Sequence, residues 1–374
     1  MDNLNNEYVQ ESVAAHMRAF ARIMDEALFS TSKYIEKHVA WCEFCSLTRR
    51  FKFMGKGEAQ WISLSCGMDS RAHVAHWMEH NTSSVSHYAA LSESLIITAA
   101  NVIAAKLALP VAYSGTADAP HHSWFSNEVR AHALAQGFLA GCKKVHVAHV
   151  GQSPSLGYRP SDGTPFFSGS ITGVVWPNTR PFMQESIRID PDARILGIPS
   201  QGIDGHGVPF LMQRGLMLAD GFLTHVPGEK KLSTRTLGEE ILAPARSIVG
   251  FIEEFIPHSL DVHAILPVRD NGVATLLDFE ERIPLTYYIE NWPAPLPPIF
   301  YFLQDELGIH ISELLMNVNY GIGCFILAPQ RSVKSILALG RKIHLPIYEL
   351  GYVLQGERKV VFRPENNLVI SAAT

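Results

Sequence analysis

The spacing of apolar residues predicts a long helix near the start of the chain, followed by alternating strands and helices. The apolar side chains that recur every three or four positions within residues 7–38 are Val13, Met17, Phe20, Ile23, Met24 and Leu28. The short runs "QWISLS" and "PVAYSG" predict strands. The longer runs "SESLIITAANVIAAKLAL" and "EVRAHALAQGFLAGCKK" predict helices, and the strand-like "VHVAHV" follows them. This alternation is typical of an α/β domain.

A second α/β region follows a segment rich in proline and glycine. The strand-like "ITGVVWPNTRP" ends in prolines, which places a domain boundary within 177–190. Beyond it, "RILGIPSQG", "YGIGCFILAP" and "IYELGYVLQ" predict strands, whereas "PFLMQRGLMLADGF" and "ARSIVGFIEEFI" predict helices. We therefore expect an α/β (α+β) protein with a helical segment at 1–40, a first domain at 41–178 and a second at 179–374.

The composition narrows the classes of protein that this chain could represent. Of its 374 residues 47% are hydrophobic and 18% charged, which indicates a folded chain. The net charge of −5 gives no basic surface, so we expect no nucleic-acid partner. No run approaches about 18 apolar residues and the start is polar, so we expect neither a membrane span nor a signal peptide. The five scattered cysteines suggest no disulfide framework, which favours the cytoplasm.

The stretch "SCGMDSRAH", residues 65–73, joins a predicted strand to a predicted helix. Such junctions often bind phosphate, because free amide N–H groups at a helix start attract anions. Its letters resemble the S-G-G-x-D-S loop of ATP pyrophosphatases and also the G-T-D-G-V-G loop of AIR synthetases. His73, His76 and His80 share one face of the following helix, so a metal site is a further interpretation.

An ordered series of motifs decides between the two loops. The second half holds "ILAPARSIV" (241–249), "DVHAI" (261–265), "PPIFYFLQ" (297–304) and "NVNYGIGCFILAP" (317–329). The first half adds "YVQESVA", "AGCKKVHVAHVGQSPSLGY" and "ITGVV". In this order and near this spacing, the motifs resemble AIR synthetase, phosphoribosylformylglycinamidine cyclo-ligase. The match extends over more than 300 residues, so we favour it over the six-letter pyrophosphatase match.

The resemblance implies a fold, an assembly and a reaction. It implies two AIR-synthetase-like α/β domains, with the N-terminal sheets of two subunits joined into a barrel at a homodimer interface. It also implies ATP-dependent ring closure in purine synthesis, with ATP and Mg²⁺ as cofactors. In that reaction ATP phosphorylates the formyl oxygen of formylglycinamidine ribonucleotide, and an amidine nitrogen then closes the imidazole ring.

Four positions of the first domain correspond to the family's nucleotide-binding residues. Asp69, after a one-residue slip, corresponds to the aspartate of the loop, and His73 stands where the family has lysine. Asn101 replaces the carboxylate of V-N-D, and Gln152 replaces the glutamate of G-G-E-T. The resemblance thus assigns all four to nucleotide binding, Asp69 and Asn101 to the metal, and Asp69 also to catalysis.

Two turns of the second domain correspond to the family's substrate-binding motifs. The residues that stand at H-S-N-G and within H-L-T-G-G-G include Asp204, His206, Arg269, Asn271 and Gly272. We expect Asp204 and His206 to act as a catalytic acid–base pair, and the other three to bind the ligand. Arg269 could replace missing glycine amides as a phosphate ligand.

Most motif positions that carry charge or glycine in the family are altered here. The chain is thus interpreted as a divergent AIR-synthetase-like enzyme of purine-type metabolism that binds a nucleotide or ribonucleotide. One alternative is a catalytically silent, homodimeric homologue with a binding or regulatory role. Another is a metal-binding protein that uses its histidines, although we do not expect Zn²⁺. We expect Cys66 and the Cys42–Cys45 pair to be incidental thiols.

Overall fold

The computed structural model describes most of the chain. The described residues are 2–37, 39–44, 49–53, 60–67, 69–157, 163–176, 179, 188–204, 207–227, 235–258, 260–268, 271–278 and 284–371. The side chains of 2–14, 35–37, 39–44, 49–53 and 69 are not among those described. The chain divides into two compact units, residues 1–103 with 110–177 and residues 104–109 with 178–374. The mixed α/β fold expected from the sequence is confirmed.

Unit 1 combines helices with a four-stranded sheet. Its helical elements are α1 (Asp2–Leu28), η1 (Phe29–Lys37), α2 (Asp69–Thr82), α3 (His87–Ala104), η2 (His122–Ser126) and α4 (Glu128–Val145). Its strands are β1 (Val39–Phe44), β2 (Arg49–Phe53), β3 (Gln60–Gly67), β4 (Ala108–Ala119), β5 (Ala148–Leu156) and β6 (Phe166–Val175). The predicted helix over 7–38 is therefore divided, because residues Phe29–Lys37 form the tighter helix η1.

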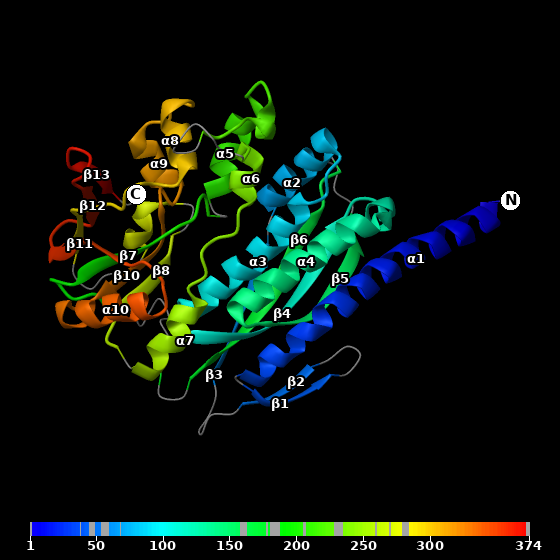
Figure 1. The fold of residues 1–374 in the computed structure, drawn as a ribbon, viewed down its shortest axis with the longest axis horizontal. Helices are drawn as coiled ribbons and strands as arrows, with labels where there is room; N and C mark the ends of the chain where they lie inside the picture. The colour runs from blue at the N-terminus through cyan, green and yellow to red at the C-terminus, as the bar shows by residue number, and fades with distance from the viewer. Residues whose placement is uncertain are drawn as a thin grey trace. The chain divides into compact units, whose positions relative to one another are not determined.

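The sheet of unit 1 has the strand order β3-β6-β4-β5, with β3 antiparallel to β6 and β4 parallel to β5. Helices α3 and α4 lie against one face (Figure 1). On that face Phe167 packs against Tyr88 and Trp124, and all three side chains are buried. On the other face Ser63, Ser65 and other small polar residues are exposed. Helix α1 packs along α4 and β5.

Unit 2 is built on a seven-stranded sheet with the order β13-β12-β9-β11-β7-β10-β8. Its strands are β7 (Arg194–Pro199), β8 (Ala264–Pro267), β9 (Leu285–Ile289), β10 (Ile322–Ala328), β11 (Tyr348–Gln355), β12 (Lys359–Phe362) and β13 (Leu368–Ser371). The helices are α5 (Val208–Leu216), η5 (Gly221–Leu223), α6 (Leu237–Leu242), α7 (Val249–His258), η6 (Val273–Leu277), α8 (Pro298–Asp305), α9 (Ile311–Asn317) and α10 (Gln330–Lys342). The family-like motif at 317–329 forms the end of α9 and the fully buried centre of β10.

No helix in the described part of the chain is long and apolar enough to cross a membrane.

Candidate functional site

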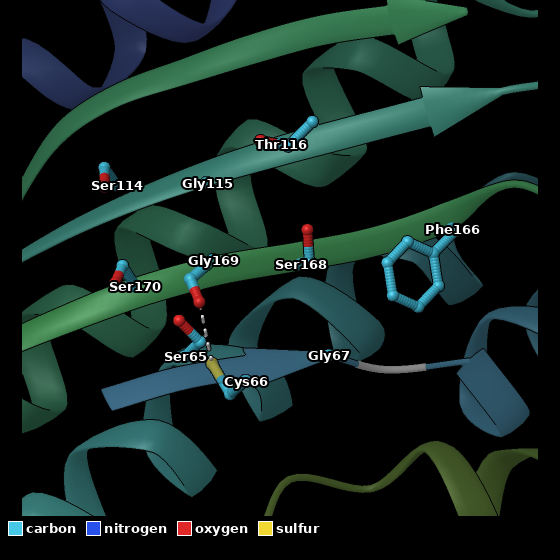
Figure 2. A pocket seen from close by; sticks show the side chains of 10 residues that line it. All are labelled: Ser65, Cys66, Gly67, Ser114, Gly115, Thr116, Phe166, Ser168, Gly169 and Ser170. Atoms are coloured by element: carbon cyan, nitrogen blue, oxygen red, sulfur yellow. Dashed lines mark hydrogen bonds between the residues drawn. The ribbon is translucent and has the colours of Figure 1, made fainter. Parts of the chain in front are cut away.

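A pocket opens on the exposed face of the unit 1 sheet, beside the junction of β3 and α2. It has a volume of about 420 Å³, within the roughly 300–1,000 Å³ usual for ligand sites. The residues that line it are Ser65, Cys66, Gly67, Ser114, Gly115, Thr116, Phe166, Ser168, Gly169 and Ser170. Figure 2 shows the pocket with the helices behind the strands. The predicted phosphate stretch thus contributes its first three residues to a hollow in the sheet.

The register of the strands explains why small polar side chains meet here. In the β3–β6 pair Ser65 lies opposite Ser170, and Gly67 lies opposite Ser168. Since successive strand residues point to opposite faces, alternate residues of both strands share the exposed face. Strand β4 contributes Ser114 to the same pocket. The hollow forms because small hydroxyl side chains and glycines leave part of the backbone uncovered.

Cys66 lines the pocket as a thiol rather than as a thiolate. Its Sγ donates to the carbonyl oxygen of Gly169 at 3.7 Å. Burial raises the pKa of Cys66 to about 11, so it is protonated near neutral pH. Since the thiolate is the nucleophilic form, this site does not activate Cys66 for nucleophilic catalysis.

Two of the predicted residues lie on helix α2, immediately beyond the pocket. Asp69 is the first residue of the helix, and its side chain lies outside the described residues. His73 lies one turn further on, with its Nδ1 3.4 Å from Thr164 Oγ1. The junction therefore places the start of α2 two residues after Gly67, as the sequence pattern predicted.

Gln152 is buried in β5, with 6% of its surface exposed, and its amide is engaged within the sheet. Its amide lies 3.3 Å from Nε2 of His149. When the amide nitrogen donates to His149, its oxygen accepts from the backbone N–H groups of Ala117 and Thr116 at 3.1 and 3.3 Å. Gly115 accommodates this side chain, because a Cβ there would lie 2.2 Å from Gln152 Oε1. The amide oxygen is thus already used by the protein.

Asn101 lies in the last turn of α3, before β4 begins. Figure 2 shows that β6 runs opposite to β4, and β6 is also antiparallel to β3. Strands β3 and β4 therefore point the same way, so the end of β3 and the start of β4 lie at opposite ends of the sheet. Asp69 follows the end of β3, whereas Asn101 precedes the start of β4. The fold does not bring these two predicted metal ligands together.

These placements bear on the implied Mg²⁺ site. Magnesium prefers several oxygen ligands in octahedral geometry. Gln152 uses its oxygen on backbone amides, and Asn101 lies away from the start of α2. Among the described residues no group of three His, Cys, Asp or Glu side chains could hold a metal ion. The described side chains thus do not fit a Mg²⁺ site, and we derive no chemistry through that ion.

In unit 2 one buried asparagine, in the turn before β10, holds the loop after β7 that carries the predicted residue Asp204. Asn319 Oδ1 accepts from the backbone N–H of Asp204 at 3.0 Å, and its Nδ2 donates to the carbonyl of Gly202 at 2.9 Å. An Asp204 oxygen also lies 3.2 Å from where a Cβ on Gly323 would stand. The loop after β7 is therefore held against the turn that begins β10. Sequence reasoning did not single out Asn319, although it belongs to the motif at 317–329.

The predicted ligand-binding residues after β8 have local structural partners. Asn271 Nδ2 donates to Asp278 Oδ1 at 2.6 Å, and Thr275 Oγ1 donates to Asn271 Oδ1 at 2.8 Å. Gly272 has φ +57°, and a Cβ there would lie 2.2 Å from the carbonyl oxygen of Leu315. Both residues therefore shape the turn that leads into η6. His206 and Arg269 lie outside the described residues.

The serine and threonine row of β4 and β6 was missed by the sequence reasoning. Its pattern was visible in "YSGTAD" and "SGSITG", where small polar residues recur at every second position. That spacing marks one face of a strand, but serine and glycine also occur on ordinary solvent-facing strands. Only the pairing of β3, β6 and β4 shows that the rows adjoin.

Comparisons with known proteins support the family resemblance. The chain is 24% identical over 242 residues to phosphoribosylformylglycinamidine cyclo-ligase of Lactobacillus helveticus, covering 61% of this chain and 65% of that protein. It is 25% identical over 244 residues to the Brevibacillus brevis enzyme, covering 62% and 65%. The match spans just under two thirds of the length of these relatives. No family model matches the chain.

Solved structures define the class of fold. Thiamine-monophosphate kinase of Stenotrophomonas maltophilia superposes with a TM-score of 0.59 at 14% identity, covering 90% of this chain and 95% of that one. The hydrogenase maturation protein HypE of E. coli gives 0.58 at 13%, covering 94% of both chains. HypE in complex with ATP gives 0.57 at 14%, covering 88% of both. The chain thus has the fold of this group of proteins. In sequence it is similar to AIR synthetase, which confirms the resemblance.

Proposed function

We propose that this chain is an AIR-synthetase-like enzyme that binds ATP at the β3–α2 junction and performs ATP-dependent ring closure. The observation that carries the proposal is this junction itself, where an open pocket adjoins the start of a 14-residue helix. Free N–H groups at a helix start favour phosphate. The support from outside the site is the similarity to cyclo-ligases and the ATP complex of a protein with the same fold.

In this proposal the phosphates lie at the first turn of α2. Asp69 begins that turn, and His73 follows one turn later at the position where the family has lysine. The second ligand, a ribonucleotide, contacts the unit 2 loops that carry Asp204 and His206, with Arg269 as the phosphate contact. Asn271 and Gly272 support this second site through the geometry of their turn.

A second candidate function is ligand binding without turnover. It is favoured by Gln152, because the residue that replaces a family glutamate bonds through its amide to His149 and to backbone N–H groups. A chain of this kind would bind nucleotide and serve as a regulatory partner. Both functions predict that the chain binds ATP. Ring closure also predicts ADP release, whereas binding without turnover predicts none.

Titration calorimetry with ATP, with and without Mg²⁺, tests binding. We expect saturable heat for the native chain, weakened in Asp69→Asn and unchanged in the matched surface variant Asp25→Asn. ADP release with formylglycinamidine ribonucleotide then separates ring closure from silent binding. No ATP binding at millimolar concentration would end both proposals.

We also propose a homodimer formed through the exposed face of the unit 1 sheet. That face carries Trp61, which is 41% exposed, beside rows of small polar residues. Light scattering after size exclusion should give twice the 41.4 kDa of one chain. Trp61→Glu should shift the mass toward one chain, whereas Phe29→Glu, also an exposed aromatic, should not. A native chain that elutes as a monomer would contradict the dimer.

A cytoplasmic location is the final part of the proposal. Cys66, Cys142 and Cys324, the cysteines whose side chains are described, are free thiols. Free thiols suit a reducing compartment.

A further inference from the structure

The side chain of Gln152 joins the parallel strands β4 and β5 where their pairing is irregular. Gln152 lies opposite Gly115, and the register skips Val150 shortly before it. Beyond this irregularity the amide oxygen of Gln152 accepts from the backbone N–H groups of Ala117 and Thr116, at 3.1 and 3.3 Å. The side chain thus supplies β4 with an acceptor that reaches it from β5.

The nitrogen of the same amide faces a buried histidine. It donates to Nε2 of His149 at 3.3 Å, and only 7% of His149 is exposed. The imidazole lies against the rings of Tyr113 and Phe138, with ring centres 5.3 and 5.0 Å away. The backbone N–H of His149 donates to Thr31 Oγ1 at 2.9 Å, which attaches η1 to the same place. Both ends of the Gln152 amide are therefore bonded inside the core of unit 1.

A cation bound through Gln152 would have to compete with these bonds. Mg²⁺ dehydrates reluctantly and usually keeps several of its waters. Only 6% of Gln152 is exposed, so its oxygen offers a hydrated ion little access. Turning the side chain toward solvent would deprive the N–H groups of Thr116 and Ala117 of this acceptor, which is costly inside a protein. The packing therefore opposes a metal ion at position 152.

We propose that Gln152 has replaced a cation ligand with a contact that joins β4 to β5, so that β5 holds no Mg²⁺ in this chain. The inference rests on the proposed function only in treating Gln152 as the counterpart of the family's glutamate. A carboxylate restored by Gln152→Glu meets the same backbone donors and the same imidazole, so it does not restore a metal site. The phosphates of the proposed nucleotide are then bound from α2, without a cation shared with β5.

A manganese titration followed by electron paramagnetic resonance tests this role, because the oxygen ligands that suit Mg²⁺ also suit Mn²⁺. The full chain is titrated without nucleotide, so a failure of ATP binding would end the proposed function and leave this result intact. Gln152→Met removes the amide oxygen and should leave the amount of bound Mn²⁺ as in the native chain. Gln152→Glu should gain no bound Mn²⁺. The matched control is Ser153→Glu, which adds a carboxylate at the exposed neighbouring position.

A measurement on the native chain decides the question even if these variants do not fold. With glutamine side chains labelled with ¹⁵N, Mn²⁺ should not broaden the amide signal of Gln152, because no ion lies beside it. Three results would each overturn the proposal. They are broadening of this signal by stoichiometric Mn²⁺, loss of bound Mn²⁺ in folded Gln152→Met, and a Mn²⁺ gained in Gln152→Glu but not in Ser153→Glu.

Discussion

Arg130 and Glu79 form an ion pair with an N–O distance of 2.5 Å that links helix α4 to helix α2. Only 11% and 13% of the two side chains are exposed. The guanidinium also donates to the carbonyl of Trp124 and lies 4.7 Å from the centre of its ring. Tyr88 Oη donates to the second oxygen of Glu79 at 3.0 Å. One charged pair therefore joins α2, α3 and α4 behind the sheet that carries the pocket.

Removing the cation from this pair should strongly destabilise unit 1. Arg130→Met leaves the Glu79 charge without its partner, and breaking a buried pair typically costs about 3–5 kcal/mol. Urea unfolding measures the loss. The control is Arg22→Met, because the Arg22–Glu26 pair is 71% exposed on both sides and should contribute less than about 1 kcal/mol. Equal stability of the two variants would contradict this role.

Two fully buried tyrosines should respond in opposite ways to loss of the hydroxyl. Tyr113 Oη has no hydrogen-bond partner in the described part of the chain, so Tyr113→Phe should keep or raise stability, by up to about 1 kcal/mol. Tyr88→Phe removes the bond to Glu79 and should cost about 1–3 kcal/mol. Thermal unfolding of both variants measures this contrast. A large loss in Tyr113→Phe would show that its hydroxyl has a partner after all.

Stability should fall with acid in a way that depends on His149. Burial lowers the pKa of His149 to about 4, although its bond to Gln152 opposes this shift. The unfolded chain therefore binds the proton near pH 6.5 while the folded chain does not. The resulting stability is fully present above pH 6.5 and is lost as the pH falls toward 4, by at most about 3 kcal/mol.

The variant His149→Gln should flatten this part of the pH profile of unfolding free energy. His80→Gln is the control, because His80 is exposed on α2. Carboxylates also make the unfolding free energy depend on acid pH in the native chain and in both variants. The comparison therefore uses the difference between each variant's curve and that of the native chain. Parallel curves for the native chain and His149→Gln would contradict the prediction.

Asn319 should be essential for the loop that carries Asp204. Asn319→Leu leaves the Asp204 N–H and the Gly202 carbonyl without their bonds in a buried position, which should cost about 2–5 kcal/mol. Asn317→Leu is a nearby control, since the only partner of the Asn317 side chain among the described residues is the Glu313 carbonyl of its own helix. Urea unfolding compares the two, and hydrogen exchange shows whether the loop opens. Full protection in Asn319→Leu would contradict the assignment.

The sequence was sufficient to predict the fold class, because the spacing of apolar residues follows from which side chains each helix or strand buries. The order of the family-like motifs added the order of these elements along the chain. The positions of β3, β10 and α7 follow from runs such as "QWISLS" and "YGIGCFILAP". It was not sufficient for the site, because a motif aligns residues without stating what they contact. Gln152 aligns with a ligand position and yet bonds within its own sheet. Asn101 lies at the other end of the sheet from Asp69, which only the strand directions reveal.

The pairing of β3 with β6 also determines how unit 1 is made. Their bonded residues are more than one hundred positions apart, as in Ser63 and Thr172. During synthesis β3 leaves the ribosome long before β6 is made. Until then the backbone N–H and C=O groups of β3 lack the strand with which they pair. Contacts of such long range slow folding, and an unpaired edge strand invites association with other chains. Strand β3, which contributes the first pocket residues, therefore gains its sheet partner last, when β6, the final strand of unit 1, emerges.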